Sequence, residues 1–365
     1  IVENTELEVV ENEKKEKTIS ISKPADTDKA KYEGKIVTRT VIAENIYGIK
    51  SEPWTFKFNA DFTLPNITPT TVDSKVSSYD GWFNKTTLSL NGTCTDENSG
   101  ISYVTYKLGE KEGEIYPSGE NKEAFAANIG GFAEGSNNLN LSVTDNAGNT
   151  SNPILKVLKI DTTSPKLLET VAPDAAADSD VSSIWYRFKD ESGESEWEKF
   201  EGSILTNVTK DIELTGTFED KNGEIIQSGV KNITIKVNSK EKDATVYEKV
   251  DGTWTEKSFD VVEEGRWYAV IPASYLGNAE CKATVSIVDN AGNEGITKDV
   301  IFQIDTKAPK VTVEMPSTGS VLNGNNTFSG KVEDANNVQS IELFYVMNDS
   351  APTNFTGFSL LGKKV

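Results

Sequence analysis

The sequence contains no histidine among its 365 residues, and only two cysteines. The absence of histidine removes the Ser-His and Cys-His pairs of many nucleophilic enzymes and the commonest base at neutral pH. It also makes a zinc site improbable, because Cys94 and Cys281 are the remaining soft ligands and lie in non-equivalent places. Two cysteines are too few for a disulfide framework, so we expect both thiols to be unpaired. Carboxylate pairs are too common here to single one out, and we expect no catalysis.

Positive charge is also scarce. The chain has 37 Lys and Arg residues against 57 Asp and Glu residues, which gives a net charge of −20. Nucleic acids and anionic membranes select basic patches, so neither is expected as a partner. No apolar run approaches the roughly 20 residues that cross a bilayer, and we expect no direct membrane insertion in this segment. The acidic surface is compatible with cation binding.

What the sequence does contain is a phrase that occurs twice. Asp-Asn-Ala-Gly-Asn stands at 145–149 and again at 289–293. Each copy is followed by a strand-like run, then by Asp161 or Asp305, and four residues later by a proline. A degenerate third copy upstream ends on Asp61, with a proline at the same offset. A repeated boundary of this kind indicates an array of modules.

A second recurring element, Gly-x-x-x-Asp, marks the first half of a module at 92–96, 216–220 and 330–334. The two elements together predict two complete modules between two incomplete ones. The predicted boundaries are 1–61 for a C-terminal half, 62–165 and 166–309 for the complete modules, and 310–365 for an N-terminal half. Because the pattern stops in mid-module, we expect the sequence to be part of a longer protein.

Strand signals dominate the chain, and no helical period persists. Alternating or β-branched runs are separated by clusters of Asn, Asp, Gly and Ser, which is typical of antiparallel sandwiches. The predicted strands cover 17–22, 35–43, 86–90, 102–107, 138–143, 211–215, 230–237, 284–288 and 340–346. The sequence therefore predicts an all-β fold.

The phrases at 145–149 and 289–293, with Ile-Asp-Thr-Thr-Ser-Pro at 160–165 and Ile-Asp-Thr-Lys-Ala-Pro at 304–309, resemble the bacterial immunoglobulin-like repeats of large extracellular surface proteins and adhesins. The resemblance implies tandem immunoglobulin-like antiparallel β-sandwiches in a linear array. It also implies a non-catalytic structural or adhesive stalk segment of a long bacterial cell-surface protein or extracellular filament. The expected location is therefore extracellular or at the cell surface, and the expected partners are neighbouring modules or subunits.

Two other functions stay open at this point. One is an accessory carbohydrate-binding segment of a secreted glycan-processing enzyme, with a host or environmental glycan or protein as partner. The other is a polymer in which neighbouring subunits complete the terminal half-modules.

Some adhesins with similar repeats bind calcium between modules, so the resemblance implies a calcium site at each joint. Calcium takes six to eight oxygen ligands, which the boundary phrases supply. The predicted ligands are Asp96, Asp145, Asn146 and Asp161 for one module and Asp220, Asp289, Asn290 and Asp305 for the next, with Asn149 and Asn293 nearby and with Asp161 and Asp305 shared between modules. The alternative is turn chemistry alone, because Asp, Asn and Gly are what a tight hairpin prefers.

The second complete module is the longer one. Its closing aspartate follows the previous one by 144 residues, against 100 for the first complete module. The extra residues are predicted to form added β-hairpins, and they are rich in aromatic side chains. The candidates for a contact surface are Trp185, Tyr186, Trp197, Trp254, Trp267 and Tyr268. Adjacent strand residues face opposite ways, so at most one of each Trp-Tyr pair can be a contact. The alternative is that these aromatics fill a larger core.

Overall fold

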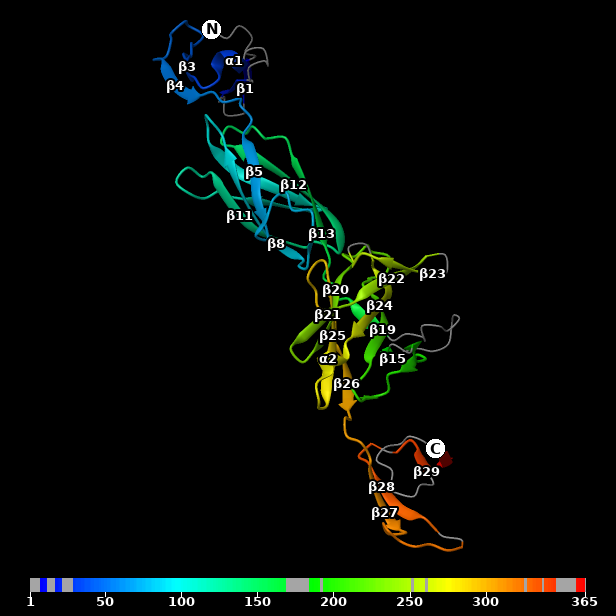
Figure 1. The fold of residues 1–365 in the computed structure, drawn as a ribbon. Helices are drawn as coiled ribbons and strands as arrows, with labels where there is room; N and C mark the ends of the chain where they lie inside the picture. Colours follow the sequence, from blue (N-terminus) through cyan, green and yellow to red (C-terminus); the bar gives the residue numbers. More distant parts are fainter. Residues whose placement is uncertain are drawn as a thin grey trace.

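A computed structural model describes residues 7–11, 17–21, 29–168, 184–190, 193–250, 253–259, 262–324, 327–336, 338–345 and 359–364. Strands dominate these ranges, and the two helices found in them are one turn long, α1 (Lys29–Tyr32) and α2 (Ala273–Leu276). Neither helix is long and apolar enough to cross a membrane. The modules follow one another along a line from the N-terminus to the C-terminus (Figure 1). The predicted all-β fold is confirmed.

The first complete module is a sandwich of two sheets, here called the first sandwich. One sheet has the order β10 (Lys111–Ile115), β9 (Ile101–Leu108), β12 (Gly135–Asp145), β13 (Ile154–Ile160) and β7 (Trp82–Phe83). The other has the order β11 (Ala124–Gly130), β8 (Thr87–Thr95), β5 (Asn66–Val72) and β6 (Lys75–Val76). Alternate residues of both sheets point inward, and Leu88, Leu90, Val104, Leu141 and Val143 are almost fully buried between them.

The second complete module is here called the enlarged sandwich. Its larger sheet has the order β16 (Gly193–Glu194), β15 (Trp185–Asp190), β19 (Asp211–Glu219), β24 (Glu264–Ile271), β22 (Thr245–Val250) and β23 (Thr253–Lys257). In addition, β14 (Lys166–Leu168) pairs with β19, and β17 (Glu198–Lys199) pairs with β15. The smaller sheet has the order β18 (Ile204–Thr206), β26 (Lys298–Ile304), β25 (Cys281–Asp289), β20 (Val230–Val237) and β21 (Lys240–Asp243).

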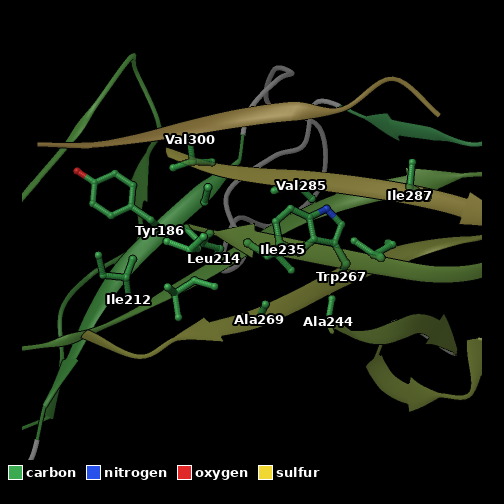
Figure 2. Packing of buried hydrophobic residues seen from close by; sticks show 14 of the residues in the cluster. Tyr186, Ile212, Leu214, Ile235, Ala244, Trp267, Ala269, Val285, Ile287 and Val300 are labelled. Carbon is green, nitrogen blue, oxygen red and sulfur yellow. The ribbon is translucent and has the colours of Figure 1, made fainter. Parts of the chain in front are cut away.

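A separate core fills the enlarged sandwich. Figure 2 shows Trp267 lying among Leu214, Ile235 and Val285, with Tyr186 at one end of the cluster. Only 1% of Trp267 is exposed. The two cysteines belong to different modules, Cys94 to the first core and Cys281 to the edge of the second, and both are free.

The terminal segments contribute two-stranded sheets. The N-terminal pairs are β1 (Leu7–Glu11) with β2 (Lys17–Ile21), and β3 (Ile36–Val41) with β4 (Trp54–Asn59). The C-terminal pairs are β27 (Lys310–Met315) with β28 (Ser329–Glu333), and β29 (Ile341–Tyr345) with β30 (Ser359–Lys364).

The degenerate upstream repeat folds as its two better copies do. Ser51 accepts a hydrogen bond from the N–H of Ala43 at 3.0 Å, and Ser151 accepts the equivalent bond from Val143 at 3.0 Å. In both places the serine N–H donates back to the same partner, which closes the hairpin. The sequence alignment of these two copies therefore corresponds to a shared backbone structure.

All nine predicted strands overlap strands of the structure, although Ser22 and Val346 lie outside the described residues. The predicted added hairpins are also confirmed. The first is made by β15 with β16 and β17, and the second by β22 with β23. Residues 191–192 and 251–252, between the strands of these hairpins, lie outside the described residues.

The glycine of the Gly-x-x-x-Asp element stands where a strand neighbour approaches closely. A Cβ on Gly92 would lie 2.7 Å from the carbonyl oxygen of Thr68, and one on Gly330 would lie 2.3 Å from that of Thr312. No side chain fits at such a distance, so the packing of the neighbouring strand requires glycine at these two positions.

Candidate metal centres at the module joints

Three aspartates from different parts of the chain meet between the first and the enlarged sandwich. Asp161 follows β13 directly, Asp220 follows β19, and Asp289 ends β25. Each offers a carboxylate oxygen, and these oxygens all lie within 4.8 Å of one another. All three side chains are fully buried, at 0% exposure. We call this set the second joint.

The same arrangement occurs one module earlier. Asp61, Asp96 and Asp145 bring their carboxylate oxygens within 4.8 Å of one another. Asp61 and Asp145 are buried and Asp96 is half-buried. We call this set the first joint.

At the second joint, the repeated hairpin at 289–293 closes its own turn and also binds the linker. Asp289 accepts hydrogen bonds from the N–H groups of Gly292 and Asn293, at 2.6 and 2.7 Å, and this closes the turn. The amide of Asn293 then donates to the carbonyl oxygen of Asp161 at 2.9 Å. The hairpin residues of one module therefore hold the linker that arrives from the preceding module.

Asn149 acts in the same way at the first joint. Its N–H and its amide donate to the carboxylate of Asp145 at 2.8 and 2.7 Å, and its amide donates to the carbonyl oxygen of Asp61 at 3.1 Å. The Asp and Asn residues therefore close the turn at both hairpins, and the same asparagines also bind the linker at each joint.

Asn146 and Asn290 clamp the loop that follows the Gly-x-x-x-Asp element. Asn146 donates its amide to the carbonyl oxygen of Ser99, and Asn290 donates to those of Ser228 and Gly229. The structure thus places these two predicted ligands beside the carboxylates and occupies their amide nitrogens with backbone contacts.

The linker aspartates group differently from the prediction. Asp161 was expected to join Asp96 and Asp145 and to be shared with the next module. It lies with Asp220 and Asp289 of that next module, and Asp96 and Asp145 are grouped with Asp61 instead. The reason is the direction of β13, which pairs with β12 and runs from the hairpin to the opposite end of the sandwich. A strand of seven residues spans about 24 Å, so the residue after it cannot return to the hairpin.

Asp61 was missing from the predicted ligands, although the sequence repeat contained it. Asp305 was listed with the enlarged module and expected to be shared with the next one, and it contacts the C-terminal segment. It accepts hydrogen bonds from the amide of Asn336 at 2.9 Å and from the N–H of Lys307 at 2.9 Å. Asp305 therefore lies at the boundary with the C-terminal segment, as Asp61 and Asp161 lie at the boundaries of the two preceding modules.

A glutamate of the preceding module also holds each linker. Glu33 accepts hydrogen bonds from the N–H of Phe62 at 2.9 Å and from the amide of Asn98 at 2.7 Å. Glu134 accepts bonds from the N–H of Thr162 at 3.1 Å and from its hydroxyl. The signal that was overlooked is a repeated Glu-Gly pair before a strand, at 33–34 and 134–135.

The charge of the second joint is poorly compensated. Neither carboxylate oxygen of Asp220 has a partner at hydrogen-bond distance and angle, although the nearby N–H of Gly229 acts to lower its pKa. Burial, followed by the charges of Asp161 and Asp289, raises the pKa of Asp220 to about 7. Burial also raises the pKa of Asp289, in spite of the bonds from Asn293.

The first joint is better compensated. Burial acts to raise the pKa of Asp61, but hydrogen bonds from Ser99 and Thr63 outweigh it and lower that pKa. One oxygen of Asp96 accepts three N–H groups, from Asn98, Ser99 and Gly100, while its other oxygen has no partner.

The residues fit a hard cation. Calcium takes oxygen ligands from carboxylates and carbonyls, and a buried oxygen without a donor is one that a cation satisfies. The described residues of both joints contribute no sulfur or imidazole ligand, so this donor set does not suit zinc.

The sequence pattern of the bacterial Ig-like domain matches residues 62–161 and 194–306, which is more than half of the chain. The chain belongs to the bacterial Ig-like domain family. No curated protein matches it.

Several solved structures resemble these Ig-like modules. The fibronectin(III)-like modules of CbhA from Clostridium thermocellum share 14% identity with a TM-score of 0.30, over 64% of this chain and 93% of theirs. A putative membrane anchored protein from Corynebacterium diphtheriae shares 13% identity with a TM-score of 0.23, over 70% of this chain and 63% of its own. The adhesin InvE of Yersinia pseudotuberculosis shares 12% identity with a TM-score of 0.20, over 66% of this chain and 59% of its own. The family follows from the sequence pattern matched over the two complete modules.

The aromatic insertion of the enlarged Ig-like module divides between its core and its outer face. Tyr186 and Trp267 lie in the core, so these two are not available as contacts. Their neighbours Trp185 and Tyr268 point to the opposite face and are half-buried. Thr215 lies between them in the same cross-strand row.

The remaining two candidates are stacked against arginines. The guanidinium of Arg187 lies 4.5 Å from the ring centre of Trp197, and that of Arg266 lies 4.8 Å from the ring centre of Trp254. Such cation–π contacts fix the tryptophans on the outer face of the sheet.

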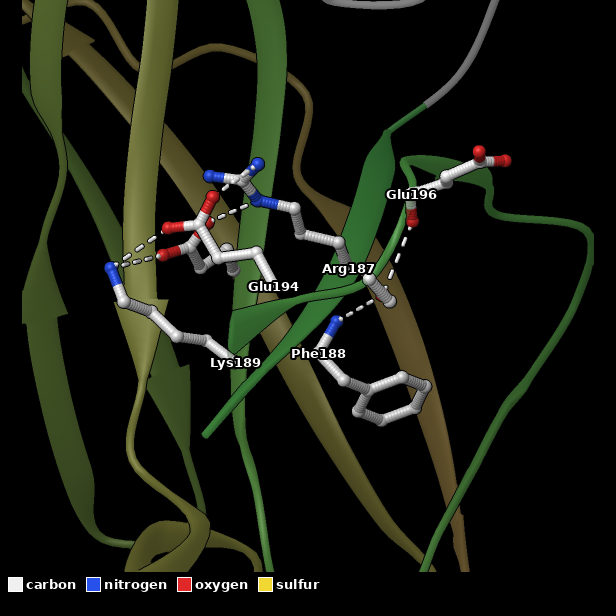
Figure 3. Close-up of polar contacts among 7 residues, drawn as sticks. Arg187, Phe188, Lys189, Glu194 and Glu196 are labelled. Atoms are coloured by element: carbon white, nitrogen blue, oxygen red, sulfur yellow. Dashed lines mark hydrogen bonds and ion pairs between the residues drawn. The ribbon is translucent and has the colours of Figure 1, made fainter. Parts of the chain in front are cut away.

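A buried glutamate lies beneath this aromatic layer. Glu213 is fully buried, hydrogen-bonds Arg187, and forms an ion pair with Lys189 at 3.2 Å. Glu194 reaches the same two cations from the added hairpin (Figure 3). Burial acts to raise the pKa of Glu213, but bonds from Tyr268, Arg187 and Lys189 outweigh it and lower that pKa. The network pins β15 and its hairpin to the sheet.

Proposed function

We propose that this chain is a non-catalytic stalk segment of a long bacterial cell-surface protein or extracellular filament, and that calcium stiffens its joints. The observation that carries the proposal is the second joint. Three buried carboxylates converge from two modules, and the oxygens of Asp220 have no protein donor. Three such charges repel one another strongly in a buried place unless a cation lies among them.

The linker supports this function by being short. Only residues 161–165 separate β13 from β14, and Pro165 restricts the backbone at the end of the linker. Glu134 holds the linker from one side, and Asn293 holds it from the other. A cation bound by Asp161, Asp220 and Asp289 would add a third connection between the modules.

A rigid array holds a distal element away from the surface to which the protein is anchored. Calcium at about 1 mM, in the range where extracellular modules bind it, would keep such an array extended outside the cell. The partners of this segment are then the neighbouring modules or subunits of the same assembly.

Small-angle X-ray scattering of the whole chain tests the proposal. With calcium at about 2 mM, we expect a pair-distance distribution of a single extended shape. After chelation, the distribution should become broader because the modules take several relative orientations. Asp161→Ala should show the broader distribution in both conditions. Identical curves with calcium and with chelator would contradict the stalk mechanism.

The outer aromatic face supports a second candidate, recognition of a glycan in an accessory segment of a secreted enzyme. Trp185 and Tyr268 lie in one row on this face, and aromatic rings of this kind stack on sugars. A glycan array with wild type and Trp185→Ala tests it, with the exposed Tyr116→Ala as the matched control. Binding that Trp185→Ala removes and the control retains would support recognition, and an array without binding would remove this candidate.

A further inference from the structure

The loop after the Gly-x-x-x-Asp element differs in length between the two joints. In the first joint, two residues, 97–98, separate Asp96 from Ser99 and Gly100. In the second joint, seven residues, 221–227, separate Asp220 from Ser228 and Gly229. The two Ser-Gly pairs are equivalent, because Asn146 and Asn290 bind their carbonyl oxygens in the same way.

The short loop closes on its own aspartate. The N–H groups of Asn98, Ser99 and Gly100 all donate to one oxygen of Asp96, at 3.1, 2.8 and 2.8 Å. A carboxylate that accepts three N–H groups is stabilised as an anion without any cation.

The long loop leaves its aspartate without donors. It turns on itself, with the N–H of Ile225 donating to the carbonyl oxygen of Asn222 at 3.2 Å, and it contacts the preceding module through Asn222 and Thr163 at 3.1 Å. Ser228 donates its N–H to Asp161 at 2.8 Å, and not to Asp220. Both oxygens of Asp220 therefore remain without partners at 0% exposure.

The geometry points to unequal joints: the second joint, built on Asp220, needs a divalent cation such as calcium and binds it more tightly, whereas the first joint, built on Asp96, keeps its arrangement without one. This inference rests on the proposed calcium function of the same sites. The free energy of binding is the difference between the cation-bound and the cation-free state of a joint. The cation-free state is less favourable at the second joint than at the first, so the second joint gains more free energy on binding. A cation that binds Asp220 removes the free-energy cost of a buried carboxylate without partners, which corresponds to a calcium affinity roughly tenfold or more higher than that of the first joint.

Calorimetric titration of the whole chain with calcium chloride tests the difference. We expect two classes of site whose affinities differ by about tenfold or more. Asp220→Asn should remove the tighter class, and the matched Asp96→Asn should remove or weaken only the other. Equal affinities, or loss of the tighter class in Asp96→Asn, would overturn the inference and leave the calcium joints themselves intact. Absence of any calcium binding would overturn both proposals.

Differential scanning calorimetry in chelator gives an independent test that does not depend on affinity. Asp220→Asn removes a repelling charge that nothing satisfies, so it should raise the transition temperature of the enlarged module by about 3 °C. Asp96→Asn weakens the acceptor of three N–H groups, so it should leave the transition of the first module unchanged or lower it. A lowered transition in Asp220→Asn without calcium would overturn the inference.

Discussion

The side-chain amide of Asn293 donates to the backbone carbonyl of Asp161 at 2.9 Å, across a sequence separation of 132 residues. Asn293 closes the last hairpin of the enlarged module, while Asp161 begins the linker that leads into that module. The contact joins the last hairpin of the enlarged module to the linker at the start of that module, and so to the preceding module. Asn149 and Asp61 repeat it one module earlier. The joints are therefore built by the same repeated phrases that made the modules recognisable.

Replacing Asn293 by Ala should destabilise the enlarged module. The substitution removes amide bonds to Asp161, Thr163 and Asp289, of which the last is a charge-assisted bond at 2.7 Å. We expect a loss of about 1–3 kcal/mol in the free energy of unfolding. Urea unfolding followed by tryptophan fluorescence measures it, because four of the six tryptophans lie in this module. Asn121→Ala, in an exposed turn, is the matched control, and an equal effect of both variants would count against the role of Asn293.

Replacing Glu134 by Ala should loosen the second joint with little effect on the modules. Glu134 binds the linker at Thr162 and contributes no side chain to a core. Scattering should show a broader distance distribution, while the two thermal transitions stay within about 1 °C of wild type. Glu120→Ala, in an exposed turn, is the control. A variant with the scattering curve of wild type would show that Glu134 does not restrain the linker.

Acid should destabilise the enlarged module through Glu213. The pKa of Glu213 is lower in the folded state, so its carboxylate stabilises the fold fully above its ordinary pKa of 4.5. That stabilisation decreases as the pH falls below the unfolded-state pKa, and it is gone once the pH is below the lower pKa of the folded state. Glu213→Gln should therefore lower the free energy of unfolding at pH 7 and make it less sensitive to pH below about 4.5. Urea unfolding at several pH values measures this, with the exposed Glu256→Gln as control, and an unchanged acid dependence in Glu213→Gln would contradict the assignment.

The core tryptophan of one Trp-Tyr pair and the outer-face tryptophan of the other should differ sharply on substitution. Trp267 is 1% exposed in the core, so Trp267→Ala should cost about 3–5 kcal/mol in the free energy of unfolding. Trp185 is half-buried on the outer face, so Trp185→Ala should cost clearly less. Chemical unfolding followed by far-ultraviolet circular dichroism, which does not depend on the tryptophan removed, compares them. A larger cost for Trp185 would contradict the assignment of the faces.

The sequence was sufficient to predict the sandwiches. The repeated hairpin at 145–149 and 289–293 and the Gly-x-x-x-Asp element are local signals, and each requires the same backbone structure wherever it occurs. Alternation along a strand also limited each Trp-Tyr pair to one core residue. It did not say which one, because that depends on the register of β15 and β24 in the sheet.

The composition of each site required the three-dimensional structure. The grouping of Asp161 with Asp220 follows from the direction of β13, which the spacing of the motifs does not contain. The unpartnered oxygens of Asp220 follow from the path of the loop at 221–227, which no turn motif predicts. Glu134 was overlooked because a Glu-Gly pair is too short a signal to stand out in an acidic chain.

Thermal unfolding of the whole chain, with calcium at about 2 mM and again with excess chelator, tests the central claim most directly. A ligand at about 100 times its dissociation constant stabilises the folded state by ~2.7 kcal/mol, which moves a transition by several degrees. The account predicts such a shift in the transition of the enlarged module, and its loss in Asp161→Ala. Coincident curves for wild type in calcium and in chelator would contradict the account, and would leave Asp145 and Asp289 as turn-forming residues alone.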